Sequence, residues 1–255
     1  MIFDADTHIS PTGEDAQAIT YAELLRRMDR ASVERALTWL RPPYMREISA
    51  SNQYVHEAVR AHPDRLFGFG WADPHLGIDQ SKDEIRRCIE EYGFYGVKLN
   101  GAQNSFFVDD PRLSIPLIEE VARLGKPLAF HVGTDAYEFT HPFRVAKIAR
   151  MFPDLTILVV HMGGVGFADL SDAAIEMAEQ YPNLVLIGSA VRFENVYKAI
   201  RRLGAGRVCF GSDTPFGMMH VCVAAYRAML QEDLTPREYE DVMCGNISRA
   251  LGITT

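Results

Sequence analysis

The sequence has few cysteines and no apolar run that approaches the length of a membrane span. Its four cysteines are scattered and form no Cys-x-x-Cys pair: Cys88, Cys209, Cys222 and Cys244. This pattern excludes a disulfide framework and predicts reduced packing residues in a cytoplasmic protein. A bilayer span needs roughly 20 consecutive apolar residues, and a signal peptide needs a basic segment before an apolar one. We therefore expect neither a membrane protein nor a signal peptide.

Basic residues are also the minority among the charges. The chain carries 26 Lys and Arg against 34 Asp and Glu, which gives a formal net charge of −8 and leaves no basic patch for nucleic acid. Small substrates, carboxylates included, are not excluded, because local charge in a pocket can oppose the overall sign. No linker or low-complexity stretch divides the 255 residues, so we predict a single domain over residues 1–255.

Eight apolar segments with strand character alternate with helix-forming segments, at a repeat of roughly 30 residues. Continuous apolar runs such as Ile157–Val160 indicate a parallel sheet that is covered by helices. Such alternation fits a closed barrel or a doubly wound open sheet. No Gly-x-Gly-x-x-Gly follows a strand, and the length suits the roughly 250 residues of a barrel. We predict a single (β/α)8 TIM barrel with strands at 1–5, 36–40, 66–71, 95–99, 127–130, 155–160, 184–187 and 208–211. We also predict a helix over residues 78–92 and a helix that Asp110 and Pro111 open.

The first strand runs directly into Asp6-Thr7-His8. Side chains of a strand alternate between its two faces, so Asp6 and His8 are expected on the same side. A carboxylate and an imidazole at one strand end can hold a divalent metal if other strands bring further ligands. Short triplets of this kind also arise by chance, so the other strand ends decide the matter.

The carboxyl ends of barrel strands meet at one rim, where the active sites of such barrels lie. There the fifth strand ends in His131, the sixth in His161, and the eighth leads to Asp213. Each alone has a plainer explanation, such as a rim hydrogen bond or a helix cap. Together with Asp6 and His8 they predict a His/Asp metal site that suits zinc. The rim residues that we expect to bind the substrate are Trp71, Lys98, Asn100 and Arg192.

Two of these residue types have competing interpretations. Arg192 presents a planar fork that binds a carboxylate at two points, but it can equally be a surface residue paired with Glu194. The large aromatic side chains can line an apolar pocket, although such residues more often pack in the core or at the rim. They are Trp39, Tyr44, Trp71, Phe106 and Phe107.

Five stretches resemble the amidohydrolase superfamily and follow its order along the chain: residues 4–8, 96–100, 125–131, 160–164 and 210–216. The resemblance is closer to the branch that contains aminocarboxymuconate-semialdehyde decarboxylase and related small hydrolases. It implies one divalent metal, commonly zinc, and a sixth-strand histidine, here His161, that acts on water or substrate. The implied ligands are Asp6, His8, His131 and Asp213. Analogy with this branch also suggests a homodimer.

The chain departs from the family pattern at two positions. Asp6 stands where the family usually has a histidine; a carboxylate weakens the Lewis acidity of the metal and also admits manganese. Some relatives, decarboxylases in particular, carry an acidic residue there. Asn100 stands where a histidine is common, which puts in doubt a substrate inferred through this loop. Lys98 matches a lysine that bridges two metals in binuclear members, but we favour an ordinary pocket or structural role.

From the sequence we favour a metal-dependent hydrolase of a small amide, ester or lactone. Asp213 would take the proton of a metal-activated water and His161 would polarise the scissile carbonyl. The second hypothesis is a metal-dependent, non-oxidative decarboxylase of a small unsaturated or aromatic acid. In that case Arg192 or Lys98 would hold the carboxylate and His161 would handle protons. A catalytically silent binding protein is the third, and the nearly complete ligand set argues against it.

Overall fold

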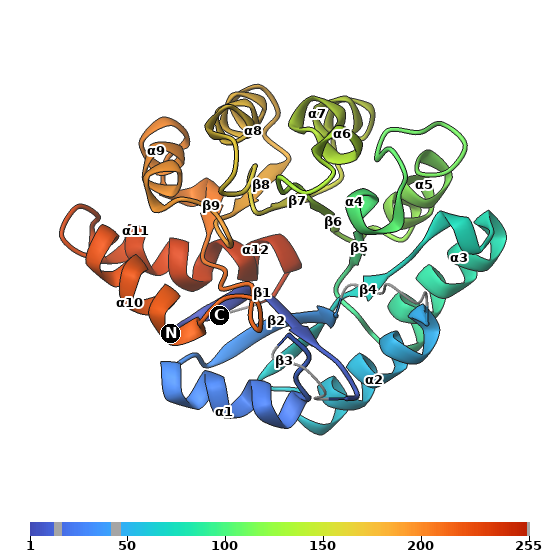
Figure 1. The fold of residues 1–255 in the computed structure, drawn as a ribbon, viewed down its shortest axis with the longest axis horizontal. Coiled ribbons are helices and arrows are strands. Elements are labelled where there is room, and N and C mark those ends of the chain that lie inside the picture. Colours follow the sequence, from blue (N-terminus) through green and yellow to red (C-terminus); the bar gives the residue numbers. More distant parts are fainter. Residues whose placement is uncertain (13–16, 42–46, 254–255) are drawn as a thin grey trace.

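The computed structural model describes residues 1–12, 17–41 and 47–253. Strands alternate with helices along the chain, and the helices form an outer ring around the strands (Figure 1). The strands are β1 (Phe3–Ile9), β2 (Arg35–Leu40), β3 (Leu66–Gly68), β4 (Gly70–Trp71), β5 (Val97–Leu99), β6 (Leu128–His131), β7 (Ile157–Val160), β8 (Leu184–Ile187) and β9 (Val208–Cys209).

The helices vary from single turns to four-turn elements. They are α1 (Tyr21–Ala31), α2 (Ile48–Ala61), α3 (Ile78–Arg86), α4 (Gly101–Asn104), α5 (Ile115–Arg123), α6 (Tyr137–Thr140), α7 (Pro142–Met151), α8 (Ala168–Gln180), α9 (Phe193–Leu203), α10 (Met219–Leu230), α11 (Pro236–Glu240) and α12 (Asn246–Leu251). Short 3₁₀ or π segments are η1 (Pro74–Leu76), η2 (Arg87–Glu91), η3 (Ala205–Arg207) and η4 (Asp241–Gly245). None of the described helices is long and apolar enough to cross a membrane.

The strands form a closed parallel barrel. Hydrogen bonds join the strands in the orders β1-β2-β3 and β4-β5-β6-β7-β8-β9. The strands β3 and β4 are two parts of the third barrel strand, which is interrupted at Phe69. The Phe69 N–H still bonds to the carbonyl of Thr38 at 3.0 Å. Closure comes from Ala5 N–H to Phe210 O at 3.0 Å and His8 N–H to Thr214 O at 2.7 Å. The predicted TIM barrel is therefore confirmed, whereas a single domain over residues 1–255 stays a prediction.

Apolar side chains fill the amino-terminal half of the barrel interior. Phe3, Leu37 and Leu158 pack there with other inward-facing residues of the strands. The C-terminal segment closes this end, because Ile247 and Leu251 of α12 belong to the same cluster. A second cluster packs the helices against the outer face of the strands. This packing leaves the carboxyl end of the strands for the carboxylate and imidazole side chains of the interior.

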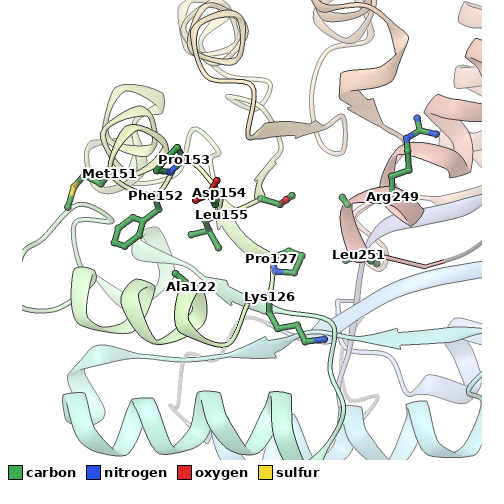
Figure 2. A pocket seen from close by; sticks show the side chains of 14 residues that line it. Ala122, Lys126, Pro127, Met151, Phe152, Pro153, Asp154, Leu155, Arg249 and Leu251 are labelled. Carbon is green, nitrogen blue, oxygen red and sulfur yellow. The ribbon is translucent and has the colours of Figure 1, made fainter.

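A hollow of about 730 Å³ opens at the amino-terminal end of the barrel. Figure 2 shows its wall, with Lys126 and Pro127 before β6 on one side and Arg249 and Leu251 of α12 on the other. The residues that the sequence marks for chemistry lie at the opposite strand ends. This hollow is therefore not the site of the predicted reaction.

Two helix boundaries differ from the sequence prediction. Asp110 does not start a helix: its Oδ1 accepts the N–H groups of Arg112 and Leu113, which forms a turn, and α5 begins only at Ile115. An aspartate that binds nearby backbone in this way competes with helix formation. The helix expected over residues 78–92 is regular only to Arg86 and continues as the π-helical segment η2.

Candidate metal centre

An irregularity in β1 turns its polar residues into the barrel. Asp4 pairs with Ala36 of β2 and Thr7 with Thr38, so three steps on β1 match two on β2. Such a β-bulge shifts the alternation of side chains by one residue. Ala5 packs in the interior cluster, and the side chain of the next residue, Asp6, also lies inside the barrel. The predicted shared face of Asp6 and His8 is thus present, and the bulge is what turns that face into the barrel.

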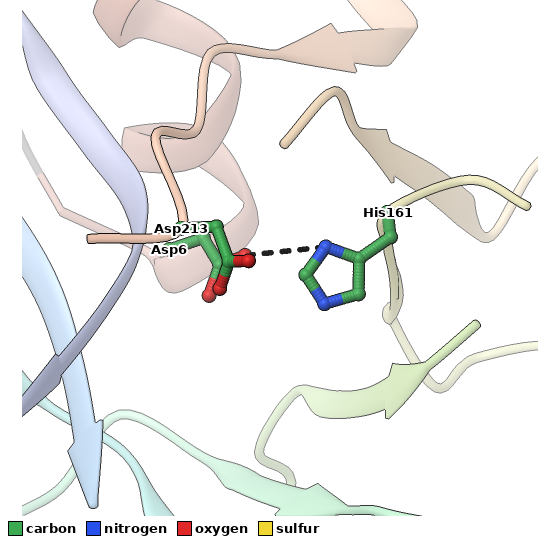
Figure 3. A group of neighbouring side chains, drawn as sticks. All are labelled: Asp6, His161 and Asp213. Carbon is green, nitrogen blue, oxygen red and sulfur yellow. Dashed lines mark ion pairs between the residues drawn. The ribbon is translucent and has the colours of Figure 1, made fainter. Parts of the chain in front are cut away.

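Three side chains from distant parts of the sequence form the centre of the site. One ligand atom from each of Asp6, His161 and Asp213 lies within 4.8 Å of the other two. Figure 3 shows the two carboxylates side by side and facing the imidazole, which approaches from the loop after β7. His161 and Asp213 have left-handed backbones, with φ of 71° and 55°. Non-glycine residues are held so at a cost of about 1–3 kcal/mol each, and functional sites concentrate such strain.

His8 presents an unprotonated nitrogen to these carboxylates. Its Nδ1 donates to the carbonyl of Leu40 at 2.8 Å, which fixes the ring and leaves Nε2 as the acceptor. Nε2 lies 3.4 Å from Asp6 Oδ1 and 3.4 Å from Asp213 Oδ1. It also accepts the indole N–H of Trp39 at 3.0 Å. A histidine whose far nitrogen is anchored to a backbone carbonyl has the tautomer that metal sites use.

Asp6 is the most enclosed anion of the cluster. Its side chain is fully buried; Ser189 Oγ donates to Oδ2, while Oδ1 has no hydrogen-bond partner among the described residues. Burial alone would raise the pKa of Asp6, but the Lys98 ammonium holds it below its usual range. A buried, ionised and unpartnered carboxylate oxygen beside an imidazole lone pair is the donor set that a divalent cation completes. Asp6, His8 and Asp213 therefore fit a metal.

The two remaining histidines occupy different positions relative to this group. His161 Nδ1 lies 3.2 Å from the carbonyl of Ser189 and 3.6 Å from Asp6 Oδ2. Burial lowers the pKa of His161 to about 4, so it is neutral at pH 7. His131 stacks edge-on against His161 at 4.6 Å between ring centroids, and its Nε2 contacts Asp135 Oδ1 at 2.7 Å. The assignment of His131 as a ligand, and of His161 to chemistry alone, stays a prediction.

Lys98 places a positive charge next to the cluster. It is fully buried on β5, and its Nζ lies 3.9 Å from Asp6 Oδ1. The ammonium sits 3.8 Å above the ring of Trp39 and 5.5 Å from that of Trp71, which stabilises it by cation–π attraction. Burial lowers the pKa of Lys98 and Asp6 opposes that effect. Nζ has no hydrogen-bond partner within the described part of the chain.

The other residues predicted to bind the substrate have mainly structural contacts. Trp71 is fully buried, and its indole N–H donates to Asn104 Oδ1 at 3.0 Å. Asn100 uses Oδ1 to cap α4, leaving Nδ2 buried and unpartnered among the described residues. Arg192 is exposed at the rim, and its Nε donates to the carbonyl of Val165. Substrate binding by these residues stays a prediction; Tyr44 lies outside the described residues.

Ser189 and Asp135 were not singled out by the sequence analysis. Ser189 bonds to both Asp6 and His161, and Asp135 bonds to His131. The signal for Ser189 was its place two residues after β8 at the rim. Asp135 lies four residues beyond β6 in a loop. Its contact could not be expected from spacing alone.

A sequence model of the family described as Amidohydrolase matches residues 4–253, nearly the whole chain. The chain belongs to this amidohydrolase family. The match begins at the residue next to the bulge of β1 and includes all the members of the candidate metal centre.

The curated relatives named below are both decarboxylases. The 2-amino-3-carboxymuconate-6-semialdehyde decarboxylase of Dictyostelium discoideum is 24% identical, over 79% of this chain and 65% of that protein. A gamma-resorcylate decarboxylase of Rhodococcus jostii is 27% identical, over 75% of this chain and 76% of its own length. A dihydroxybenzoic acid decarboxylase of Polaromonas sp., solved with manganese and the inhibitor 2-nitroresorcinol, superposes with a TM-score of 0.78 at 17% identity, covering 98% of this chain and 96% of the other.

These relatives correct the function favoured from the sequence. Both curated enzymes are decarboxylases, which cleave a carbon–carbon bond, so the expectation of a hydrolase of amides, esters or lactones is wrong. The physical reason is that both reactions use the same carboxylate and imidazole ligands at the strand ends. Ligand identity therefore did not discriminate between them. The similarity also gives no support for zinc, whereas one structural relative contains manganese.

Proposed function

We propose that this chain is a metal-dependent, non-oxidative decarboxylase of a small aromatic or unsaturated carboxylic acid. The observation that carries the proposal is the shared reaction of the curated relatives, each of which aligns with at least three quarters of the chain. The candidate metal centre supplies a place for that reaction. Because the chain spans 65% of the Dictyostelium protein, the substrate is proposed only as a class.

The charges of the site favour an acid as substrate. Lys98 is a buried cation whose Nζ lacks a hydrogen-bond partner among the described residues, and its field acts over several ångströms in this apolar setting. A neutral amide or ester would gain little from such a charge. A carboxylate entering from the rim would be attracted by it. Lys98 is therefore the preferred anchor, since the exposed Arg192 bonds to backbone at the rim.

Asp6, His8 and Asp213 would hold the metal, with His131 as the fourth predicted ligand. We propose manganese, because carboxylate-rich sites suit this oxygen-preferring ion and a structural relative contains it. When bound, the ion would supply a Lewis acid that orients the oxygens of the substrate and withdraws electrons.

The remaining chemistry is a proton replacing a carboxyl group. The bond between the carboxyl carbon and the substrate breaks, its electron pair stays on the substrate carbon, and carbon dioxide leaves. His161 and Asp213 are the groups that can deliver the proton to that carbon. Asp213 retains 13% side-chain exposure and so can exchange protons with water, whereas His161 is almost enclosed and neutral at pH 7. His161 would accept a proton that enters from water by way of Asp213 and would transfer it to the substrate carbon.

The proposal is tested with a substrate panel. Protein loaded with manganese is incubated with gamma-resorcylate, related hydroxybenzoates and unsaturated acids, and in parallel with lactones, esters and amides. We expect carbon dioxide release from at least one acid and no turnover of the neutral compounds. A His141→Asp variant cannot serve as the inactive control, because it adds a charge at the rim. The control is instead the same protein after a chelator has removed its metal. Turnover of neutral compounds alone would contradict the proposal.

A further inference from the structure

Asp4 is a buried carboxylate that the proposed chemistry does not use. It precedes the bulge of β1 and is completely buried. One of its oxygens, Oδ1, accepts two backbone hydrogen bonds: from Asp6 N–H at 3.1 Å and from Ser212 N–H at 2.9 Å. Asp6 and Ser212 are far apart in the sequence. Asp4 therefore joins the first strand to the segment that follows the last one.

The two donors are placed at the two carboxylates of the metal centre. One is the N–H of Asp6 itself, which the bulge removes from the regular ladder with β2. The other belongs to Ser212, the residue before Asp213. A single oxygen thus fixes the backbone on both sides of the gap between the Asp6 and Asp213 side chains. Both hydrogen bonds are buried, where water cannot replace a lost acceptor, so they hold this connection in place.

The neighbouring hydrogen bonds between the first and last strands do not replace those made by Asp4. The barrel closes next to it through Ala5 N–H to Phe210 O and His8 N–H to Thr214 O. Those bonds hold the neighbouring residues, but not the N–H groups of Asp6 and Ser212. Without Asp4, both N–H groups would be buried donors that have lost their acceptor, and the bulge would be free to relax.

We propose that Asp4 is a positioning residue for the metal centre, which sets the separation of Asp6 and Asp213 and thereby the affinity for the metal. It is not treated as a ligand, since it lies outside the group of Asp6, His161 and Asp213 whose ligand atoms are within 4.8 Å of one another. This inference rests on the proposed metal site. Groups that only orient metal ligands typically change metal affinity by about 10–100-fold when they are removed.

The test measures manganese binding without substrate, by calorimetry and by the electron paramagnetic resonance signal of free Mn²⁺. Asp4→Ala is expected to bind Mn²⁺ about 10–100-fold more weakly than the native protein. Asp4→Asn is expected to stay within about threefold, because its amide oxygen still accepts both N–H groups. Asp109→Ala is the matched control: it removes a carboxylate that bonds to Arg144 and Lys147 of α7, and Mn²⁺ affinity should not change.

The outcomes separate this inference from the proposed function. If Asp4→Ala binds Mn²⁺ with native affinity, or if Asp4→Ala and Asp4→Asn lose Mn²⁺ affinity equally, the inference about Asp4 is overturned. The proposed function is not affected by either result. Absence of Mn²⁺ binding in the native protein overturns the metal site as well. If Asp4→Ala does not fold, Asp4→Glu replaces it, because its extra methylene displaces the oxygen from both N–H groups while keeping the charge. Weakened Mn²⁺ binding is then expected, and native binding overturns the inference.

Discussion

Asp6→Ala is expected to abolish stoichiometric metal binding and to destabilise the protein. Asp6 Oδ1 lies 3.4 Å from His8 Nε2 and 3.9 Å from Lys98 Nζ, so the substitution removes both a proposed metal ligand and a carboxylate close to a buried ammonium. Removing one partner of a buried ion pair typically costs about 3–5 kcal/mol. Urea unfolding at pH 7 in the presence of a chelator measures this loss without a contribution from metal. Elemental analysis of protein purified without chelator measures the metal.

A double variant separates the two effects. Asp6→Ala combined with Lys98→Met removes the carboxylate and the ammonium together, and it should regain most of the lost stability, because apolar replacements of buried ion pairs are often neutral. It should not regain metal. If the double variant remains as unstable as Asp6→Ala, Lys98 does not depend on Asp6. If Asp6→Ala keeps a full equivalent of metal, Asp6 is not a ligand.

His161→Asn is expected to lower the rate of decarboxylation by about two to four orders of magnitude, the usual range for a group that transfers protons. The metal content should stay largely unchanged. The Nδ1 atom of His161 lies 3.2 Å from the carbonyl of Ser189, and Figure 3 shows the imidazole facing the two carboxylates, with Nδ1 3.6 Å from Asp6 Oδ2. Because Nδ1 already contacts Ser189, we expect His161 to act on the substrate and not to bind the metal. Rate constants and metal content are measured on the same preparation.

A second histidine of the rim provides the control for that measurement. His141 caps α7, where its Nδ1 accepts the N–H of Phe143 at 3.2 Å. Asparagine can accept the same bond, so His141→Asn should retain native rate and metal content. Loss of metal together with activity in His161→Asn would make His161 a ligand. An unchanged rate would remove it from the chemistry.

The barrel was predictable because its strands have a simple sequence signature. Continuous apolar runs such as β7 and β8 can be recognised without knowledge of their neighbours. The parallel arrangement then brings their carboxyl ends together, so Asp6, His161 and Asp213 could be expected near one another. The bulge in β1 was not predictable, since the residues around it fit a regular strand equally well.

Contacts that depend on the relative heights of strands could not be predicted. The Lys98 ammonium lies over the ring of Trp39. This contact could not be predicted, because the order of strands around the barrel does not show at which height along the barrel each side chain lies. His131 and His161 follow adjacent strands with similar spacing, yet only His161 has a ligand atom within the compact group with the two aspartates. Arg192 carries a suitable fork for a carboxylate, but the local backbone leaves it exposed at the rim.

The reaction itself was the part of the function that the sequence analysis got wrong. The same carboxylate and imidazole ligands suit a metal in either reaction, so the predicted ligand set did not distinguish hydrolysis from decarboxylation. What differs is the substrate, which is bound mainly by loops and by charge in the pocket. Lys98 was predicted to bind the substrate, with a pocket or structural role favoured over the bridging of two metals, but its position next to Asp6 is known only from the structure.

The most direct test of decarboxylation is the fate of isotopes from solvent. An acid that is turned over by the manganese-loaded protein is incubated in deuterium oxide enriched in oxygen-18, and the organic product is analysed by mass spectrometry. We predict one deuterium on the carbon that lost its carboxyl group, one carbon dioxide per product and no oxygen-18 in the organic product. An organic product that contains oxygen-18, formed without carbon dioxide, would contradict the account.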